Sequence, residues 1–110
     1  MGKKNSYRIN CNISLSLEEI AREKAYNMGL IKGGKGMVSS YISMLIMDDL
    51  KDKPVYPYKI INYNDLKRIN ITFPEELMND VRDRAGALGF IRNDEGNVSE
   101  YINFLLSQNL

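Results

Sequence analysis

The side chains that could do chemistry in this 110-residue chain are of few kinds. One cysteine and no histidine are present, which excludes a disulfide framework, a Cys/His zinc site and a histidine-assisted nucleophile. Adjacent carboxylates remain at the expected ends of helices, in the pairs Glu18-Glu19, Asp48-Asp49 and Glu75-Glu76. Adjacent helical positions do not face one another, so these pairs do not converge on an active centre. We therefore expect no enzyme activity, no cofactor, no metal site and no small-molecule substrate.

Two segments alternate polar and apolar residues with a period of two, which is typical of a half-buried strand. The pattern predicts strands over residues 8–13 and 68–73. Leu15 continues the first alternation, so that strand either ends at Ile13 or runs two residues further, with the same polar face in both cases. The polar side chains are Arg8, Asn10 and Asn12 in the first segment and Arg68, Asn70 and Thr72 in the second. Arginine can bond guanine bidentately, asparagine can do the same with adenine, and threonine can contact the thymine methyl group.

The chain contains an internal repeat with an offset of 60 residues. Residues 8–50 align with residues 68–110 without a gap, and 15 of the 43 positions are identical. A unit of 43 residues is too short to bury a core by itself, so the two copies must pack together. We expect a first unit over residues 1–50, a linker over 51–66 and a second unit over 67–110, packed as one globular domain.

Each copy predicts a strand followed by two helices. In the second copy, Pro74 is expected to open a helix that Gly89 stops, and Asn97 with Glu100 forms an N-cap signature for the next helix. In the first copy, Ser16 and Glu19 form an expected capping box. That helix is predicted from about Ser16 to Met28 and the following one from about Met37 to Leu50.

The linker over residues 51–66 has two interpretations. Pro54 and Pro57 favour an extended first part, whereas residues 58–63 are rich in strand-forming side chains. The segment is either a plain linker or a hairpin that adds a third strand to the sheet.

Positive charge is concentrated in two arms of a chain whose net charge is only +1. Residues 1–13 carry Lys3, Lys4 and Arg8 without an acid, and residues 67–73 carry Lys67 and Arg68. If the two arms meet, they form a positive face on a molecule with no overall excess.

The order of elements resembles the ribbon-helix-helix, or MetJ/Arc, family of DNA-binding proteins, over about 86 of the 110 residues. The features that carry the resemblance are the strand, the Pro or Ser helix start, the Gly stop and a second helix opening with Val-Ser. Both strands come from one chain, as in the tandem members found among relaxosome components and archaeal-virus regulators. The resemblance implies a mainly α fold with a short antiparallel β-ribbon and four helices, arranged as a single-chain pseudo-dimer.

The resemblance also implies which residues contact DNA. The base-contacting positions fall on Arg8, Asn10, Asn12, Arg68, Asn70 and Thr72. Phosphate contacts are expected at the start of each second helix and from nearby basic side chains. They fall on Lys3, Lys4, Lys32, Lys35, Val38, Ser39, Lys67, Asn97, Val98 and Ser99, with the amide of Met37 beside them. The glycines at 33 and 34 either admit a phosphate closely or merely make the turn.

The expected function is sequence-specific binding of double-stranded DNA in the major groove, as a transcriptional regulator such as a repressor. Because the copies differ at the base-contacting positions, one chain should read two unlike half-sites. The alternatives are a protein-interaction module such as an antitoxin, or a relaxosome-type accessory protein. Self-association on DNA stays open. The chain shows no signal-peptide pattern and no apolar run long enough to span a membrane, so we expect no membrane partner and an intracellular, cytoplasmic location, in the host if the source is viral.

Overall fold

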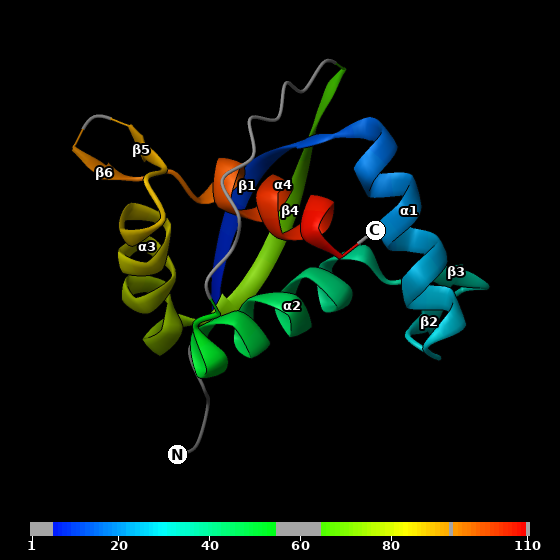
Figure 1. Cartoon of the computed structure of the whole chain (residues 1–110). Helices are drawn as coiled ribbons and strands as arrows, with labels where there is room; N and C mark the ends of the chain where they lie inside the picture. Colours follow the sequence, from blue (N-terminus) through cyan, green and yellow to red (C-terminus); the bar gives the residue numbers. More distant parts are fainter. Residues whose placement is uncertain (1–5, 55–64, 93, 110) are drawn as a thin grey trace.

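The computed structural model describes residues 6–54, 65–92 and 94–109. Within these residues the fold is mixed α/β with mostly helix (Figure 1). The helical elements are α1 (Leu15–Asn27), α2 (Val38–Asp52), the 3-10 turn η1 (Glu75–Leu77), α3 (Met78–Ala87) and α4 (Val98–Gln108). The strands are β1 (Ser6–Ser14), β2 (Ile31–Lys32), β3 (Lys35–Gly36), β4 (Leu66–Pro74), β5 (Ile91–Arg92) and β6 (Glu95–Gly96).

The strands of the two repeat copies pair with each other, as the resemblance implies. β1 and β4 form a two-stranded antiparallel sheet, which we call the ribbon. Asn10 lies opposite Asn70 at its centre, Ile9 lies opposite Ile71, and Cys11 lies opposite Ile69. Both strands extend beyond the predicted bounds, and β1 ends at Ser14. Leu15 therefore belongs to α1 rather than to the strand.

The apolar face of the ribbon is covered by helices, as expected. Cys11, Ile13 and Ile71 are buried, and the side chain of Phe73 lies outside the described part of the chain. α4 packs on β1 and α2 packs on β4, so each strand is covered by a helix of the other copy. Figure 1 shows α2 and α4 on the same side of the ribbon. The main residues of the shared core are Tyr41, Ile42, Ile46, Val81, Tyr101, Ile102 and Leu105.

The predicted helices are present, but the residues expected to start two of them do not do so. α1 begins at Leu15 and makes no side-chain capping bond, so the expected Ser16–Glu19 capping box does not form. The reason is that Ser14, the last strand residue, already precedes the helix directly. Pro74 does not open a helix either, because its ψ of 132° is extended and only the η1 turn follows before α3. The Asn97 cap is confirmed: its side chain accepts a hydrogen bond from the N–H of Glu100.

The segments between the helices of each copy form short hairpins. β2 pairs with β3 and β5 pairs with β6, which adds strands to the one strand expected in each copy. Lys32 lies opposite Lys35, so the first turn has two central residues, Gly33 and Gly34, both with positive φ. This is the backbone of a type I′ turn, which strongly favours glycine. The requirement of the turn for positive φ is therefore sufficient to explain why Gly33 and Gly34 are glycines.

Each hairpin lies tightly against the preceding helix of its own copy. A Cβ atom on Gly36 would overlap the carbonyl oxygen of Arg22 in α1. The equivalent Gly96 would overlap the carbonyl oxygen of Arg82 in α3. Only glycine permits this approach, because the obstacle is helix backbone rather than a movable side chain. The identical glycines of the two copies therefore fix the hairpins to α1 and α3.

Parts of the expected layout lie outside the described residues. These include Lys3, Lys4 and residues 58–63, on which the third-strand hypothesis rested. α2 continues to Asp52, two residues beyond the predicted Leu50. No helix in the described ranges is long and apolar enough to cross a membrane.

Candidate nucleic-acid interface

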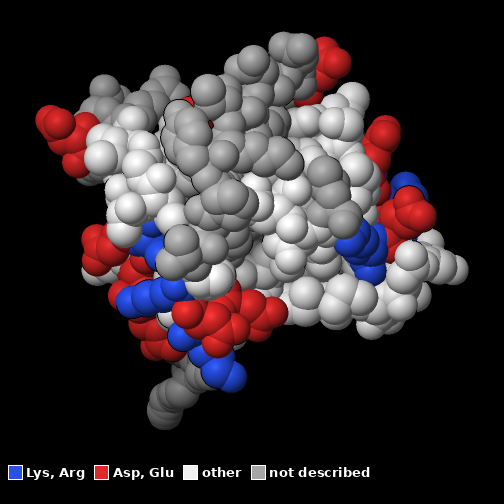
Figure 2. Space-filling view, in the orientation of Figure 1, with Lys and Arg blue, Asp and Glu red and all other residues white. Residues whose placement is uncertain are grey.

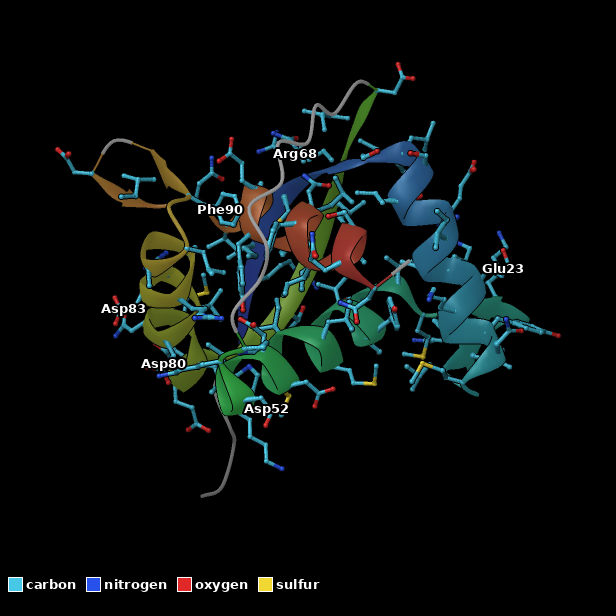
Figure 3. The ribbon with its side chains drawn as sticks, viewed as in Figure 1. Glu23, Asp52, Arg68, Asp80, Asp83 and Phe90 are labelled. Atoms are coloured by element: carbon cyan, nitrogen blue, oxygen red, sulfur yellow. The ribbon has the colours of Figure 1, made fainter. Side chains whose placement is uncertain are left out.

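The six predicted base-contacting residues lie on one face of the ribbon. Each of them is exposed, whereas the apolar residues between them face the core. The strand register brings them together in three cross-strand pairs: Arg8 opposite Thr72, Asn10 opposite Asn70, and Asn12 opposite Arg68. Figure 3 labels Arg68 beside the ribbon.

The register places the two arginines at opposite ends of this face. Arg8 belongs to one terminal pair and Arg68 to the other, four residues further along the ribbon. At a strand rise of about 3.4 Å, the two backbone positions are ~14 Å apart along the ribbon. This is close to the length of four steps of about 3.4 Å along one DNA strand. The face thus offers a guanidinium at each end with amide side chains between them.

Side chains of α4 hold one end of the ribbon in place. The N–H of Asn12 donates to Ser99 Oγ (3.2 Å), and the N–H of Ser14 donates to Asn103 Oδ1 (2.9 Å). Asn103 Nδ2 donates to the carbonyl oxygens of Asn12 (3.0 Å) and Ser99 (3.1 Å). Within the described ranges, β4 is the only strand that pairs with β1, so β1 has one free edge. The bonds from α4 satisfy backbone N–H and C=O groups along that free edge. Asn103 was not among the residues predicted from the sequence, where its only signal was its place on an otherwise apolar helix face.

The starts of α2 and α4 contain the predicted phosphate-contacting amides. Val38 and Ser39 open α2, and Val98 and Ser99 open α4. The first amides of a helix have no partner in the preceding turn and favour an anion. The N–H of Asn97 is not among them, because it donates to the carbonyl oxygen of Phe90 (2.7 Å).

The amide of Met37 is engaged in the same way at the other hairpin. It donates to the carbonyl oxygen of Leu30 (2.7 Å), so the matching expectation for this amide is also wrong. The physical reason is shared by both copies: the backbone bond closes the hairpin that leads into the helix.

The predicted phosphate-contacting lysines differ in whether they already bind a carboxylate. Lys32 and Lys35 are exposed and lie opposite each other in the β2–β3 hairpin. Lys67 Nζ instead lies 3.2 Å from Glu18 Oε1, which also binds Arg22 (3.0 Å). A phosphate would have to compete with that carboxylate for Lys67. At the corresponding hairpin of the second copy, Asp94 is exposed and would repel a phosphate.

Two carboxylates of the adjacent acidic pairs are buried in ion pairs. Glu18 is 2% exposed and Asp49 is 3% exposed. Arg84 donates to both oxygens of Asp49, from Nε at 2.9 Å and from Nη2 at 3.2 Å, and the Tyr101 hydroxyl also donates to Asp49. The sequence predicted these acids only as residues of helix ends, and their buried role was not foreseen. In both cases a cation comes from the other repeat copy, so the pairs join the two copies.

Charge of both signs is mixed on the helical side of the molecule. In Figure 2, basic and acidic atoms alternate over α3 and the end of α2, near Asp52, Asp80 and Asp83 of Figure 3. Such a surface does not attract a polyanion as a whole. The arrangement suits contact through the ribbon better than contact through this side.

Cys11 lies directly under the candidate interface and is 1% exposed. Burial raises the pKa of its thiol to about 11, against a smaller opposing effect of a hydrogen bond with Ser99. The thiol is therefore protonated at neutral pH and acts as a small apolar group in the core.

Comparisons of the chain with protein-family models, with curated proteins and with solved structures found no match. The features of the molecule that indicate a function are therefore its internal repeat, the ribbon and the chemistry of the exposed ribbon face.

Proposed function

We propose that this protein is a sequence-specific DNA-binding transcriptional regulator that reads the major groove with the β1–β4 ribbon. Its fold is proposed to be a single-chain pseudo-dimer of two ribbon-helix-helix units. The observation that carries the proposal is the exposed face with Arg8, Asn10 and Asn12 beside Arg68, Asn70 and Thr72. These side chains hydrogen-bond base edges or contact the thymine methyl group.

The dimensions of the ribbon are compatible with this role. Two paired strands lie about 4.8 Å apart, and the major groove is about 12 Å wide. A two-stranded ribbon therefore fits into the groove with its side chains directed at the bases. The helices stay outside, where the first amides of α2 and α4 can bond phosphates and fix the register.

The two halves of the interface are proposed to read unlike half-sites. The ribbon carries Asn12 in one copy and Thr72 at the equivalent position of the other. Asparagine favours adenine, whereas threonine favours contact with the thymine methyl group. The hairpins differ as well, because Lys32 and Lys35 favour the phosphate backbone and Asp94 does not. Binding of such a site at a promoter would block access of the transcription machinery.

The proposal is tested by selecting binding sites from a random duplex library with the full chain. The recovered duplex and a scrambled duplex are then titrated at two salt concentrations. We expect a short asymmetric site that is bound at least about a thousandfold more tightly than scrambled DNA. If no sequence is enriched and binding disappears with salt, the basic groups bind nonspecifically and a protein partner becomes the better explanation.

A further inference from the structure

The two ends of the ribbon are held very differently. At the end that carries Asn12 and Arg68, α4 makes three side-chain hydrogen bonds to the β1 backbone, all between 2.9 and 3.2 Å. At the end that carries Arg8 and Thr72, the described residues include one such bond, from Ser43 Oγ to the carbonyl oxygen of Thr72, at 3.5 Å. That distance is at the limit of a hydrogen bond.

Asn103 makes two of these three bonds, and their absence from the other end follows from two substitutions between the repeat copies. Asn103 of the second copy is equivalent to Ser43 of the first, and Ser14 of the first copy is equivalent to Pro74 of the second. Asn103 accepts a bond from the N–H of Ser14, but Pro74 has no N–H to offer. The longer amide side chain is therefore on α4, which faces the available N–H of Ser14, and not on α2, which faces Pro74.

The backbone at positions 14 and 74 is otherwise the same. Ser14 has φ −56° and ψ 130°, and Pro74 has φ −56° and ψ 132°. The two ends therefore differ in their side-chain hydrogen bonds to the ribbon and not in the backbone angles at these two positions.

The side-chain amide of Asn103 has hydrogen-bond partners for both its oxygen and its nitrogen. Its residue is 3% exposed, its oxygen accepts one bond, and its nitrogen donates two. A buried amide with satisfied groups fixes the neighbouring backbone firmly, since breaking its bonds leaves buried polar groups without partners.

We infer that Asn103 is a positioning residue that fixes one end of the ribbon for DNA reading, so that the half-site under Asn12 and Arg68 is read more strictly than the half-site under Arg8 and Thr72. The inference rests on the proposed function. A side chain on a fixed backbone loses less conformational entropy when it binds a base. Because it cannot move with the backbone, it also binds weakly to a base that presents its hydrogen-bonding groups elsewhere. The Arg8–Thr72 end can shift to accept alternative bases.

Two variants remove the hydrogen bond between the Ser14 N–H and Asn103 Oδ1 from opposite sides, and Asn103→Ser also removes the bond from Asn103 Nδ2 to the carbonyl oxygen of Asn12. Asn103→Ser copies the first unit, and Ser14→Pro copies the second while suiting the observed backbone angles. The selected duplex is titrated with the full chain, with single base pairs replaced in each half. Asn12→Ala and Thr72→Ala first assign the base pairs to the two ends.

Both variants should lower discrimination in the Asn12–Arg68 half by about fivefold and change the other half by less than about twofold. Because Asn103→Ser already removes the one bond that Ser14→Pro removes between these residues, the double variant should lose no more discrimination than Asn103→Ser alone. In the DNA-free protein, the Ser14 amide of Asn103→Ser should exchange its hydrogen at least about tenfold faster.

Ser43→Ala is the control at the other end, because it removes only the 3.5 Å bond to the carbonyl oxygen of Thr72 and should change discrimination in either half by less than about twofold. An equal loss in both halves, or unchanged discrimination with intact folding, would overturn the role of Asn103. Absence of any specifically bound duplex would instead contradict the proposed function, and this inference with it.

Discussion

Asn10 of β1 and Asn70 of β4 lie directly opposite each other in the ribbon, and they occupy the same position of the internal repeat. A local twofold relation between the copies therefore passes between these two residues. It follows that each end of the ribbon combines an arginine of one copy with Asn12 or Thr72 of the other. In the proposed single-chain pseudo-dimer, one chain would obtain in this way the arrangement that a symmetric dimer obtains from two chains.

Lys32→Gln together with Lys35→Gln should weaken binding of all duplexes alike. Both side chains are exposed on the β2–β3 hairpin, where they can bind phosphates but carry no sequence information. The slope of log affinity against log salt should become shallower by about one for each phosphate that is no longer neutralised. Titrations of selected and scrambled duplexes at several salt concentrations measure this effect. A weakening confined to the selected duplex would contradict the phosphate role.

Asp49→Ala should destabilise the protein by about 3–5 kcal/mol, because Arg84 and the Tyr101 hydroxyl would lose their buried acceptor. Urea unfolding followed by circular dichroism gives the free energy. The neighbouring Asp48 is exposed, so Asp48→Ala serves as the control and should change stability by less than about 0.5 kcal/mol. Similar effects of the two variants would show that the ion pair contributes little.

Gly36→Ala should destabilise the protein by about 1–3 kcal/mol, since its Cβ would overlap α1 backbone at Arg22. Gly86 is a suitable control because it lies within α3 and a Cβ there meets no atom within 4 Å. Gly86→Ala should stabilise the helix by up to about 1 kcal/mol. Thermal unfolding of both variants distinguishes close packing from a general effect of adding a methyl group.

Stability should decrease as the pH rises above about 9. Burial raises the pKa of Cys11 from its ordinary value of 9.0 to about 11, so the folded state favours the protonated thiol. This contribution is complete below pH 9 and is lost progressively as the pH approaches 11. The pKa of Tyr41 is also raised by burial and adds to the loss at the upper end. Urea unfolding between about pH 8 and 11 should show a shallower decline for Cys11→Val than for the unchanged chain.

The strand pairing and the exposed polar face could be predicted from the sequence, because a two-residue alternation fixes which side chains share a face. The repeat supplied the partner strand. The Asn97 cap was likewise readable from its spacing to Glu100.

Contacts between residues far apart in the sequence could not be predicted from such local patterns. The roles of Glu18 and Asp49 depend on Lys67 and Arg84, which lie far away in the sequence and close only in the fold. The residue that precedes α1 could not be chosen from the sequence, because Ser14 and Ser16 have similar local preferences and strand pairing up to Ser14 decides between them. The amides of Met37 and Asn97 donate to backbone carbonyls in hairpins that the sequence pattern does not predict.

The most direct test of the ribbon as the reading surface is titration of the selected duplex with Asn10→Ala/Asn70→Ala and with the unchanged chain. Both asparagines are exposed, so unfolding in urea should be the same for the two proteins. We expect specific binding to weaken by at least ~2 kcal/mol, at about 1–3 kcal/mol for each bidentate contact, while scrambled DNA is bound equally. Unchanged affinity for the selected duplex would contradict the assignment of the ribbon face.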